Sequence, residues 1–350
     1  MKIEPTPSPL EKHDPIVHAS LTRIIGGLEA DHVEGASFLI SGGAGFLGSW
    51  LVDALNMLGA GRITVIDNLS TGSIENIRHL VEEGRVELLR IPVEKYEPDK
   101  GYDYVIHMAA RPSPDDYVEH PIETLHASSI GTERMLEAAR LNDAIFLLTS
   151  TSEVYGHAQV IPIPEDYWGY VNPVGVRSCY DEGKRYAEAL TMAYMRKYGL
   201  NVRISRIFNT YGPRLDWENP GYGRVVVKFI VQALRGEPIT VHGTGMQTRS
   251  FLYAPDNIEA HIRLLRPDPN LKGAIVNIGG STEITILDLA RRILELTGSK
   301  SQIVHVEPRP DDPPRRRPDI SRARRLLGWE PRTDLDDGLK STIKWIKYRI

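Results

Sequence analysis

Three glycines spaced three residues apart, Gly42, Gly45 and Gly48, constrain the fold of this chain more than any other feature. An apolar run at 36–40 precedes them, and a helical pattern at 49–58 follows. In such a strand–turn–helix unit the first glycine makes the tight turn. The second lets the backbone approach a pyrophosphate, and the third lets the helix pack on the strand. Phosphates then lie at the helix N-terminus, where free N–H groups point at them.

An acidic residue at the end of the next strand specifies the dinucleotide. Residues 62–66 form a second apolar run, which ends at Asp67 and Asn68. An acid at this point accepts hydrogen bonds from the adenine ribose hydroxyls and would repel the 2′-phosphate of NADP. The glycines alone would also suit an ordinary strand–turn–helix connection, but strand, helix and acid together predict an NAD site. We expect Phe46 and Leu47, inside the glycine turn, to contribute to it.

Strands and helices alternate along the first part of the chain, which predicts parallel strands joined by helical crossovers. The expected strands are 36–41, 62–67, 86–90, 103–107, 144–150 and 202–208, and the main expected helices are 46–58, 73–81, 121–141 and 178–198. The sequence therefore predicts an α/β fold, a Rossmann-type doubly wound parallel sheet with a smaller C-terminal substrate-binding lobe.

We expect three regions along the chain. Residues 1–35 are an N-terminal extension with a flexible start at 1–9 and an amphipathic helix at 14–33. Residues 36–212 are mainly the NAD-binding domain. Residues 213–350 are mainly the substrate lobe, interleaved with the last elements of the first domain. In this last region prolines and glycines increase and the expected strands are scattered, at 239–242, 249–253, 275–278 and 303–306.

Composition excludes several functional classes. A net charge of −4 and a pI of about 6.3 give no strong signal for nucleic acid or an anionic membrane. The chain has no apolar run near the ~20 residues that a membrane helix needs, and its single cysteine, Cys179, excludes an internal disulfide framework. The 11 histidines show no metal-ligand spacing, so we expect no metal. A cytoplasmic location is the default expectation.

Tyr180 and Lys184 carry the predicted chemistry. On a helix at 178–198, a spacing of four residues places both side chains on one face. A cationic lysine lowers the pKa of a neighbouring phenol because it favours the phenolate. A tyrosine ordinarily titrates near ~10, so this help lets it act as a base near neutrality. The pair predicts a proton-and-hydride reaction on an alcohol, and Glu153, which follows Thr151 and Ser152, hints at a further step.

The sequence resembles the extended short-chain dehydrogenase/reductases that act on nucleotide sugars, and among them most resembles the UDP-glucuronic acid decarboxylase family. The resemblance covers residues 36–349. Beside the glycine turn it rests on separate strings, at 107–110, 151–156, 165–169, 177–185, 206–214, 247–251, and 311–313 with 316–320. Five of these strings are specific to the decarboxylases, which makes them far more informative than the glycine turn.

The resemblance implies a complete reaction on UDP-glucuronate. Tyr180 would remove the proton of the sugar 4-hydroxyl while hydride passes to NAD, and Thr151 would hold a hydroxyl beside the substrate oxygen. The resulting β-keto acid would lose carbon dioxide, and return of the hydride would give UDP-xylose, with some release of the 4-keto pentose possible. Arg316 would bind the carboxylate, since an arginine fork matches that group.

The implied site has three overlapping sets of residues. The catalytic set is Thr151, Ser152, Glu153, Tyr180, Lys184 and Arg316. The cofactor set is Gly42, Gly45, Phe46, Leu47, Gly48, Asp67, Asn68, Tyr180 and Lys184. The substrate set is Glu153, Tyr180, Asn209, Arg214, Gln247, Arg249 and Arg316, in which Arg214 and Arg249 would clamp the diphosphate.

Two alternatives stay open. A nucleotide-sugar 4-epimerase or 4,6-dehydratase would share the fold, although the Ser152–Glu153 pair argues against both. A catalytically silent NAD-binding regulator would not need an intact Tyr180 and Lys184. The chain also departs from the family pattern at Arg111, His126, Ser128 and Arg134, which bears on the grip on the substrate. By resemblance, helices 121–141 and 178–198 would form the interface of a homodimer.

Overall fold

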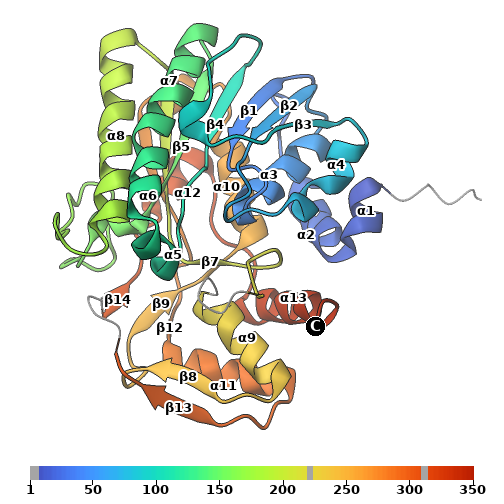
Figure 1. The fold of residues 1–350 in the computed structure, drawn as a ribbon, viewed down its shortest axis with the longest axis vertical. Helices are drawn as coiled ribbons and strands as arrows, with labels where there is room; N and C mark the ends of the chain where they lie inside the picture. Colours follow the sequence, from blue (N-terminus) through green and yellow to red (C-terminus); the bar gives the residue numbers. More distant parts are fainter. Residues whose placement is uncertain (1–7, 219–223, 309–313) are drawn as a thin grey trace, which may run out of the picture.

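The computed structural model describes residues 8–218, 224–308 and 314–350. Within them the chain forms a larger lobe around one parallel sheet and a smaller lobe at its carboxyl edge (Figure 1). The sheet has seven strands in the order β11-β6-β5-β4-β1-β2-β3. Their bounds are β1 Ser37–Ser41, β2 Arg62–Ile66, β3 Val86–Leu89, β4 Tyr104–His107, β5 Ile145–Thr151, β6 Val202–Ile207 and β11 Ala274–Ile278. The predicted α/β fold class is confirmed.

The strand order explains where a ligand can bind. The chain starts at β1 in the middle of the sheet, runs outward through β2 and β3, and then returns to β4 on the other side of β1. Ligands of open parallel sheets bind at such a reversal, beyond the carboxyl ends of the strands. The central strands β1 and β4 are buried nearly throughout, as parallel strands covered on both faces must be.

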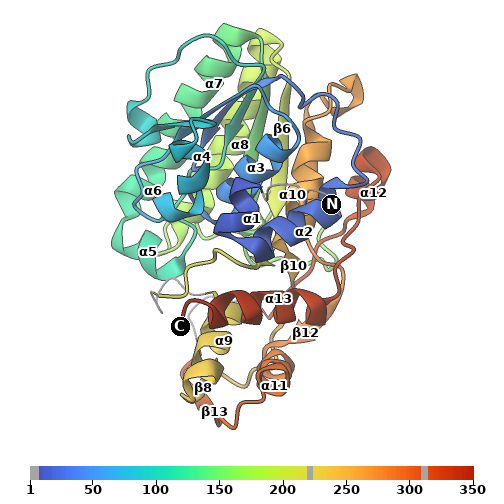
Figure 2. The same cartoon turned by 90° about the vertical axis from the view of Figure 1, so that its right-hand side faces the viewer.

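Helices cover both faces of the sheet (Figures 1 and 2). Those of the larger lobe are α3 Phe46–Met57, α4 Arg78–Glu82, α5 Pro114–Glu119, α6 Pro121–Ser128, α7 Ile130–Asn142, α8 Ser178–Tyr198, α10 Ala254–Leu264 and α12 Ser321–Leu327, with short 3-10 turns η1 Ile74–Asn76, η2 Val93–Lys95, η3 Ser152–Tyr155 and η4 Pro269–Leu271. The expected single helix at 121–141 is two helices, because the backbone leaves the helical region at Ser129 (φ −103°, ψ −80°).

The N-terminal region also differs from its prediction. Instead of one helix at 14–33 it contains α1 Pro9–His13 and α2 Pro15–Ile25. The side chain of Asp14 caps α2 and Pro15 takes its first position, while the glycine pair after Ile25 ends it. Most of the expected flexible start, residues 1–7, lies outside the described residues.

The smaller lobe is built from short strands and three helices among the described residues. Its helices are α9 Val225–Arg235, α11 Ile286–Thr297 and α13 Leu335–Lys347, and the remaining strands are β7 Thr210–Tyr211, β8 Ile239–His242, β9 Thr248–Ser250, β10 Leu252–Tyr253, β12 Glu283–Thr285, β13 Ile303–Val306 and β14 Arg315–Arg316. The expected strand at 249–253 is two strands with different partners: β9 pairs with β12 and β14, whereas β10 pairs with β7. Apolar residues of all three helices form one core.

No helix in the part of the chain that the structure describes is both long enough and apolar enough to span a lipid bilayer.

Candidate active site

A cavity of about 1610 Å³ lies at the carboxyl edge of the sheet, between the two lobes. Pockets for one drug-sized ligand are usually about 300–1,000 Å³, so this cavity has room for a dinucleotide and a second ligand together. All the predicted site residues line it. They are Gly42, Gly45, Phe46, Leu47, Gly48, Asp67, Asn68, Thr151, Ser152, Glu153, Tyr180, Lys184, Asn209, Arg214, Gln247, Arg249 and Arg316.

The glycine turn has the geometry of a phosphate cradle. Gly42 has φ +75°, and a Cβ atom there would lie 2.7 Å from the backbone nitrogen of Ala109. A Cβ atom on Gly48 would collide with the Gly42 carbonyl. Helix α3 begins after Gly45 without any side-chain cap, so the N–H groups of its first turn remain available to an anion. The turn therefore fits a dinucleotide pyrophosphate.

Asp67 lies at the end of β2, beside this turn. Its two carboxylate oxygens accept hydrogen bonds from the backbone N–H groups of Ala44 (3.0 Å) and Leu69 (2.8 Å), which fix its orientation. Burial raises the pKa of Asp67, although these two hydrogen bonds oppose the shift. Its neighbour Asn68 caps the following turn by accepting from the N–H of Ser70. The carboxylate thus lines the cavity where the predicted adenine ribose would lie.

Tyr180 and Lys184 project from α8 toward the end of β5. Lys184 Nζ donates to the Thr149 carbonyl (3.0 Å), and burial lowers its pKa to about 8. Burial also raises the pKa of Tyr180 to about 12, more than Arg224 and a hydrogen bond with Thr151 lower it. The expectation of a lowered pKa for this phenol is therefore wrong, because desolvation is the largest effect and raises it.

Glu153 lies in η3 with its carboxylate between two arginines. Arg316 from β14 donates to one oxygen and Arg177 to the other, the latter at 2.5 Å. Burial raises the pKa of Glu153, but the charges of Arg316, Arg177 and Arg249 outweigh burial and leave its pKa below the ordinary value. Three arginines thus surround one carboxylate, and a guanidinium can make charge-assisted hydrogen bonds to more than one anion.

Arg177, Arg224 and Tyr117 line the same cavity, and sequence reasoning gave them no role. Arg177 also approaches Asp181 (3.6 Å), and its i,i+4 spacing to that acid could have indicated an ion pair. The ring of Tyr117 stacks on that of Tyr180, with 5.2 Å between centroids. Nothing in the spacing of Tyr117 or Arg224 could have indicated their positions, because both come from distant segments.

The predicted substrate residues fall into two groups. Asn209 lies between β6 and β7, Gln247 immediately precedes β9, and Arg249 lies on β9. Gln247 donates to the His242 carbonyl (3.0 Å) and Arg249 to the Thr248 carbonyl (2.8 Å). Arg214 instead turns away toward the N-terminal helices and pairs with Asp53 (2.7 Å). The structure thus brings Arg214 to the cavity wall but engages its guanidinium elsewhere, and its role on the diphosphate stays a prediction.

The four departures from the family pattern are not equivalent. Arg111 lines the cavity and pairs with Asp116 at 2.5 Å. His126, Ser128 and Arg134 do not line it; Ser128, the last residue of α6, is buried and faces Gly183 of α8. Of the four departures, only Arg111 therefore borders the cavity. In residues 8–218, 224–308 and 314–350 no three side chains of the metal-ligating types are grouped to hold an ion.

Comparison with known proteins gives a consistent family. The family model described as GDP-mannose 4,6 dehydratase matches residues 39–342. The chain is 49% identical over 304 residues to UDP-glucuronic acid decarboxylase 3 of Arabidopsis thaliana, covering 86% of each. It is 47% identical over 308 residues to UDP-glucuronic acid decarboxylase 1 of Danio rerio, covering 88% of this chain and 72% of that protein.

Solved structures show the same fold. The UDP-glucuronic acid 4-epimerase of Bacillus cereus, in complex with UDP-glucuronic acid and NAD, is 27% identical with a TM-score of 0.80, over 90% of this chain and 100% of that one. The UDP-glucose 4-epimerase of Thermotoga maritima with UDP-glucose is 29% identical with a TM-score of 0.80, over 89% and 99%. With this fold, this cavity and these relatives, the chain belongs to the GDP-mannose 4,6-dehydratase family and, within it, to the UDP-glucuronic acid decarboxylases.

Proposed function

We propose that this chain converts UDP-glucuronate to UDP-xylose and carbon dioxide with a bound NAD. The observation that carries the proposal is the Glu153 carboxylate, held by Arg316 and Arg177 in the cavity that also contains Tyr180. The near-half identity to decarboxylases of plants and fish supports it. Some release of the 4-keto pentose is part of the same proposal.

The cofactor site fits NAD. Gly42, Gly45 and Gly48 would hold the pyrophosphate at the start of α3, with Phe46 and Leu47, and Asp67 with Asn68 would bind the adenine ribose. A bound NAD would supply a hydride acceptor for carbon 4 of the sugar, the positive charge of its nicotinamide, and, once carbon dioxide has left, the hydride for the 4-keto group.

Tyr180 handles the proton of the 4-hydroxyl. Its phenol is buried and hydrogen-bonded to Thr151, which places a second hydroxyl at the same oxygen. The pKa of about 12 means that the neutral phenol is the resting form at pH 7. To act as a base, Tyr180 must first release its own proton to solvent; the phenolate then takes the hydroxyl proton as the alcohol becomes a ketone. Arg224 and Thr151 favour this phenolate against the cost of burial.

Arg316 binds the carboxylate of the sugar, and Arg177 binds that of Glu153. The sugar carboxyl lies on the carbon next to the new ketone, so the C–C bond to it breaks with its electron pair passing into an enolate. Arg316 holds the carboxylate until it leaves as neutral carbon dioxide, and Glu153 stays paired with Arg177 meanwhile. A proton then returns to the enolate carbon, and Glu153 is positioned to order the water that brings it.

One assay tests this proposal. The purified chain is incubated with UDP-glucuronate and NAD, the nucleotide products are identified by mass, and carbon dioxide is trapped. UDP-xylose with carbon dioxide is expected. UDP-galacturonate without carbon dioxide would establish the alternative 4-epimerase, and loss of water from a UDP-hexose would establish a 4,6-dehydratase. No turnover of any of these sugars would favour the catalytically silent NAD-binding protein.

We also propose a homodimer, formed through α6, α7 and α8. These helices lie side by side on one flank of the larger lobe (Figure 1) and leave Ile122, Leu125 and Tyr186 exposed there. Apolar helix faces of this kind commonly close into two-fold dimers. Light scattering of the native chain and of Tyr186→Asp tests this: twice the chain mass is expected for the first only. A cytoplasmic location, compatible with one buried thiol at Cys179, completes the proposal, and cell fractionation tests it.

A further inference from the structure

The described part of the N-terminal extension, residues 8–35, precedes the region that matches the family model, which starts at residue 39. Its helices are nevertheless packed on the larger lobe: α1 against α4, and α2 against α3 and α10. Leu10, Val17 and Leu21 are buried in the same core as the glycine-turn helix. Figure 2 shows α1 and α2 beside α3 and directly above α13 of the smaller lobe. The extension therefore lies where the two lobes meet.

The first polar contact of the N-terminal extension supports the glycine turn through the short turn η1. His13 Nε2 donates to the Glu75 carbonyl in η1 at 2.7 Å. The same short turn is tied to the glycine turn, because the N–H of Ser73 and the side-chain amide of Asn76 both donate to the Ala44 carbonyl (3.1 and 3.0 Å). Ala44 in turn donates its N–H to Asp67. His13 thus completes a line of hydrogen bonds that ends at the proposed ribose-binding carboxylate.

The second polar contact of the N-terminal extension joins it to the smaller lobe through Asp14. Asp14 is 3% exposed, and one of its carboxylate oxygens accepts from Trp345 Nε1 (2.7 Å) and from Arg349 (3.1 Å). Trp345 lies in α13 and Arg349 just beyond it. The other oxygen caps α2 through the N–H of Val17 (3.2 Å). One buried carboxylate therefore joins the extension to the last helix of the opposite lobe.

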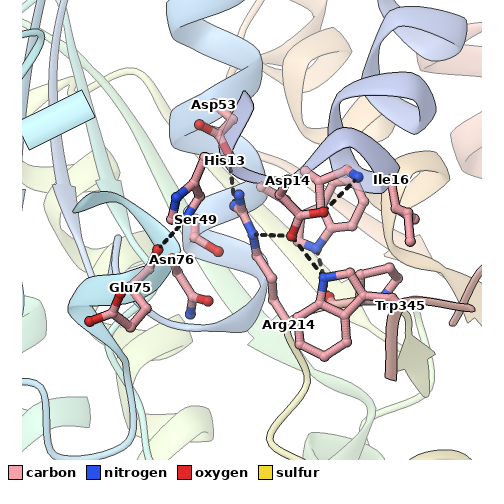
Figure 3. Close-up of polar contacts among 12 residues, drawn as sticks. His13, Asp14, Ile16, Ser49, Asp53, Glu75, Asn76, Arg214 and Trp345 are labelled. Atoms are coloured by element: carbon pink, nitrogen blue, oxygen red, sulfur yellow. Dashed lines mark hydrogen bonds and ion pairs between the residues drawn. The ribbon is translucent and has the colours of Figure 1, made fainter. Parts of the chain in front are cut away.

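Arg214 connects these contacts to the cavity (Figure 3). Its guanidinium pairs with Asp53 of α3 at 2.7 Å and reaches Asp14 at 3.9 Å. His79, which stacks on His13, donates to the other oxygen of Asp53 at 2.7 Å. Arg214 is a non-glycine residue with φ +70°, a conformation that persists only where the surroundings fix it. Asp14 and Asp53 supply that constraint, on a residue that lines the cofactor cavity.

We propose that the N-terminal extension is a clasp that closes the adenosine end of the cavity, with Asp14 as the positioning residue for Arg214. By fastening α13 to the cofactor-binding lobe, the clasp slows the release of NAD. The proposal concerns the dinucleotide, so it rests on NAD binding and is independent of the decarboxylation. The ligand it controls is the adenosine diphosphate half of the cofactor, because Asp67, Asn68 and Asn76 line that end.

The test compares NAD release from three full-length variants. Asp14→Asn keeps the size and an acceptor for Trp345 but removes the charge that faces Arg214 and Arg349. We expect NAD to dissociate roughly ten-fold faster, in line with the strength of hydrogen bonds to charged groups, measured by stopped-flow displacement. Turnover at saturating NAD should stay within about two-fold of the parent, since Asp14 does not reach the reacting atoms. Trp345→Phe, which removes one donor, should move the rate in the same direction.

The matched control is Glu11→Gln, an acid-to-amide change on the exposed side of the same segment. It should release NAD at the parent rate. If Asp14→Asn lowers the melting temperature but leaves the rate of NAD dissociation unchanged, the extension only stabilises the fold and the proposal is overturned. If Asp14→Asn does not fold, an unchanged rate in Trp345→Phe overturns it equally. If Asp14→Asn releases NAD faster but the parent chain liberates no carbon dioxide from UDP-glucuronate, the clasp proposal is supported and the proposed decarboxylase function is rejected.

Discussion

Arg316 donates a hydrogen bond to Glu153 across 163 residues of sequence, joining β14 of the smaller lobe to the turn after β5 of the larger one. In this arrangement Arg316, which is proposed to bind the sugar carboxylate, already binds the carboxylate of Glu153. We expect UDP-glucuronate to bind Arg316 either beside Glu153, since a guanidinium has five N–H donors, or in exchange for it. Arg177 pairs with the second oxygen of Glu153 and would keep that carboxylate paired in either case.

Replacing Arg316 should damage turnover of the charged substrate selectively. Loss of one partner of a buried charged pair costs on the order of 2–5 kcal/mol, which is roughly 30-fold to several thousand-fold in kcat/KM for UDP-glucuronate. Arg316→Ala is compared with Arg315→Ala, whose side chain is exposed and pairs with Glu283. UDP-glucose, which lacks the carboxylate, should bind both equally. Decarboxylation by Arg316→Ala at the parent rate would remove this residue from the site.

Replacing Arg177 should shift the acid side of the pH–rate profile. Burial raises the pKa of Glu153 and the arginines lower it, so removing one of them must move this pKa upward. If the ionised Glu153 is required, the acid limb of kcat in Arg177→Ala moves to higher pH, whereas Arg177→Lys restores most of the charge and the profile. An acid limb identical to that of the parent in both variants would show that Glu153 ionisation does not depend on Arg177.

Tyr180→Phe should lower kcat by about 10²–10⁴-fold, the usual cost of losing a positioned base. The ring would still stack on Tyr117, so the far-ultraviolet circular dichroism should stay at the parental value. Tyr186→Phe, an exposed change on the same helix, serves as the control. Activity near the parental level in Tyr180→Phe would mean that another group removes the proton.

Asp67 should set the preference for NAD. Its carboxylate is fixed by two backbone N–H groups at the cavity wall and would repel a ribose 2′-phosphate. Asp67→Asn removes the charge with little change of shape, so NADP binding should strengthen and NAD binding weaken. Calorimetric titration of both dinucleotides measures the ratio. Tighter binding of NADP than of NAD by the parent chain would contradict the assignment.

Asp181 should make the folded state less stable as the pH rises from about 4 to about 7. Burial first, and then the charge of Glu153, raise the pKa of Asp181 from 3.8 to about 7. The folded state therefore binds a proton in this window that the unfolded state does not, and stability falls as that proton leaves. The slope is at most about 1.4 kcal/mol per pH unit.

Asp181→Asn cannot lose this proton, so the slope assigned to Asp181 should be absent from it. Urea unfolding of parent and variant at pH 4.5 and pH 7.5 measures the effect. The difference in the free energy of unfolding should grow in favour of the variant at the higher pH. An equal difference at both values would mean that Asp181 titrates at its ordinary pKa.

Local patterns in the sequence predicted most of the larger lobe. The glycine spacing fixed the turn into α3, and helix α8 has the bounds that the Tyr180–Lys184 pattern indicated. The sequence did not predict the helix break at Ser129, because no proline or glycine occupies that position. The sequence did not predict the partners of Glu153 and Arg214 for a different reason. Arg316 and Asp14 come from opposite ends of the chain, and only the folded structure brings them near.

The pKa of Tyr180 shows what a spacing rule leaves out. The four-residue interval placed Lys184 on the correct face, but it said nothing about how much water the fold removes from the phenol. Burial of this phenol depends on residues from other segments, such as Tyr117, whose ring stacks on it, so the balance between charge and desolvation does not follow from one helix.

Arg249 and Arg316 stand opposite each other on the parallel strands β9 and β14. Side chains alternate between faces along a strand, so a shift of one residue in either strand would turn its arginine to the other face. A single-residue insertion or deletion next to β14 would thus turn one arginine away from the cavity although both arginines remain in the sequence. For relatives of this protein, the presence of both arginines in an alignment is therefore insufficient; their alignment must also preserve the same strand pairing before a shared carboxylate-binding function is inferred.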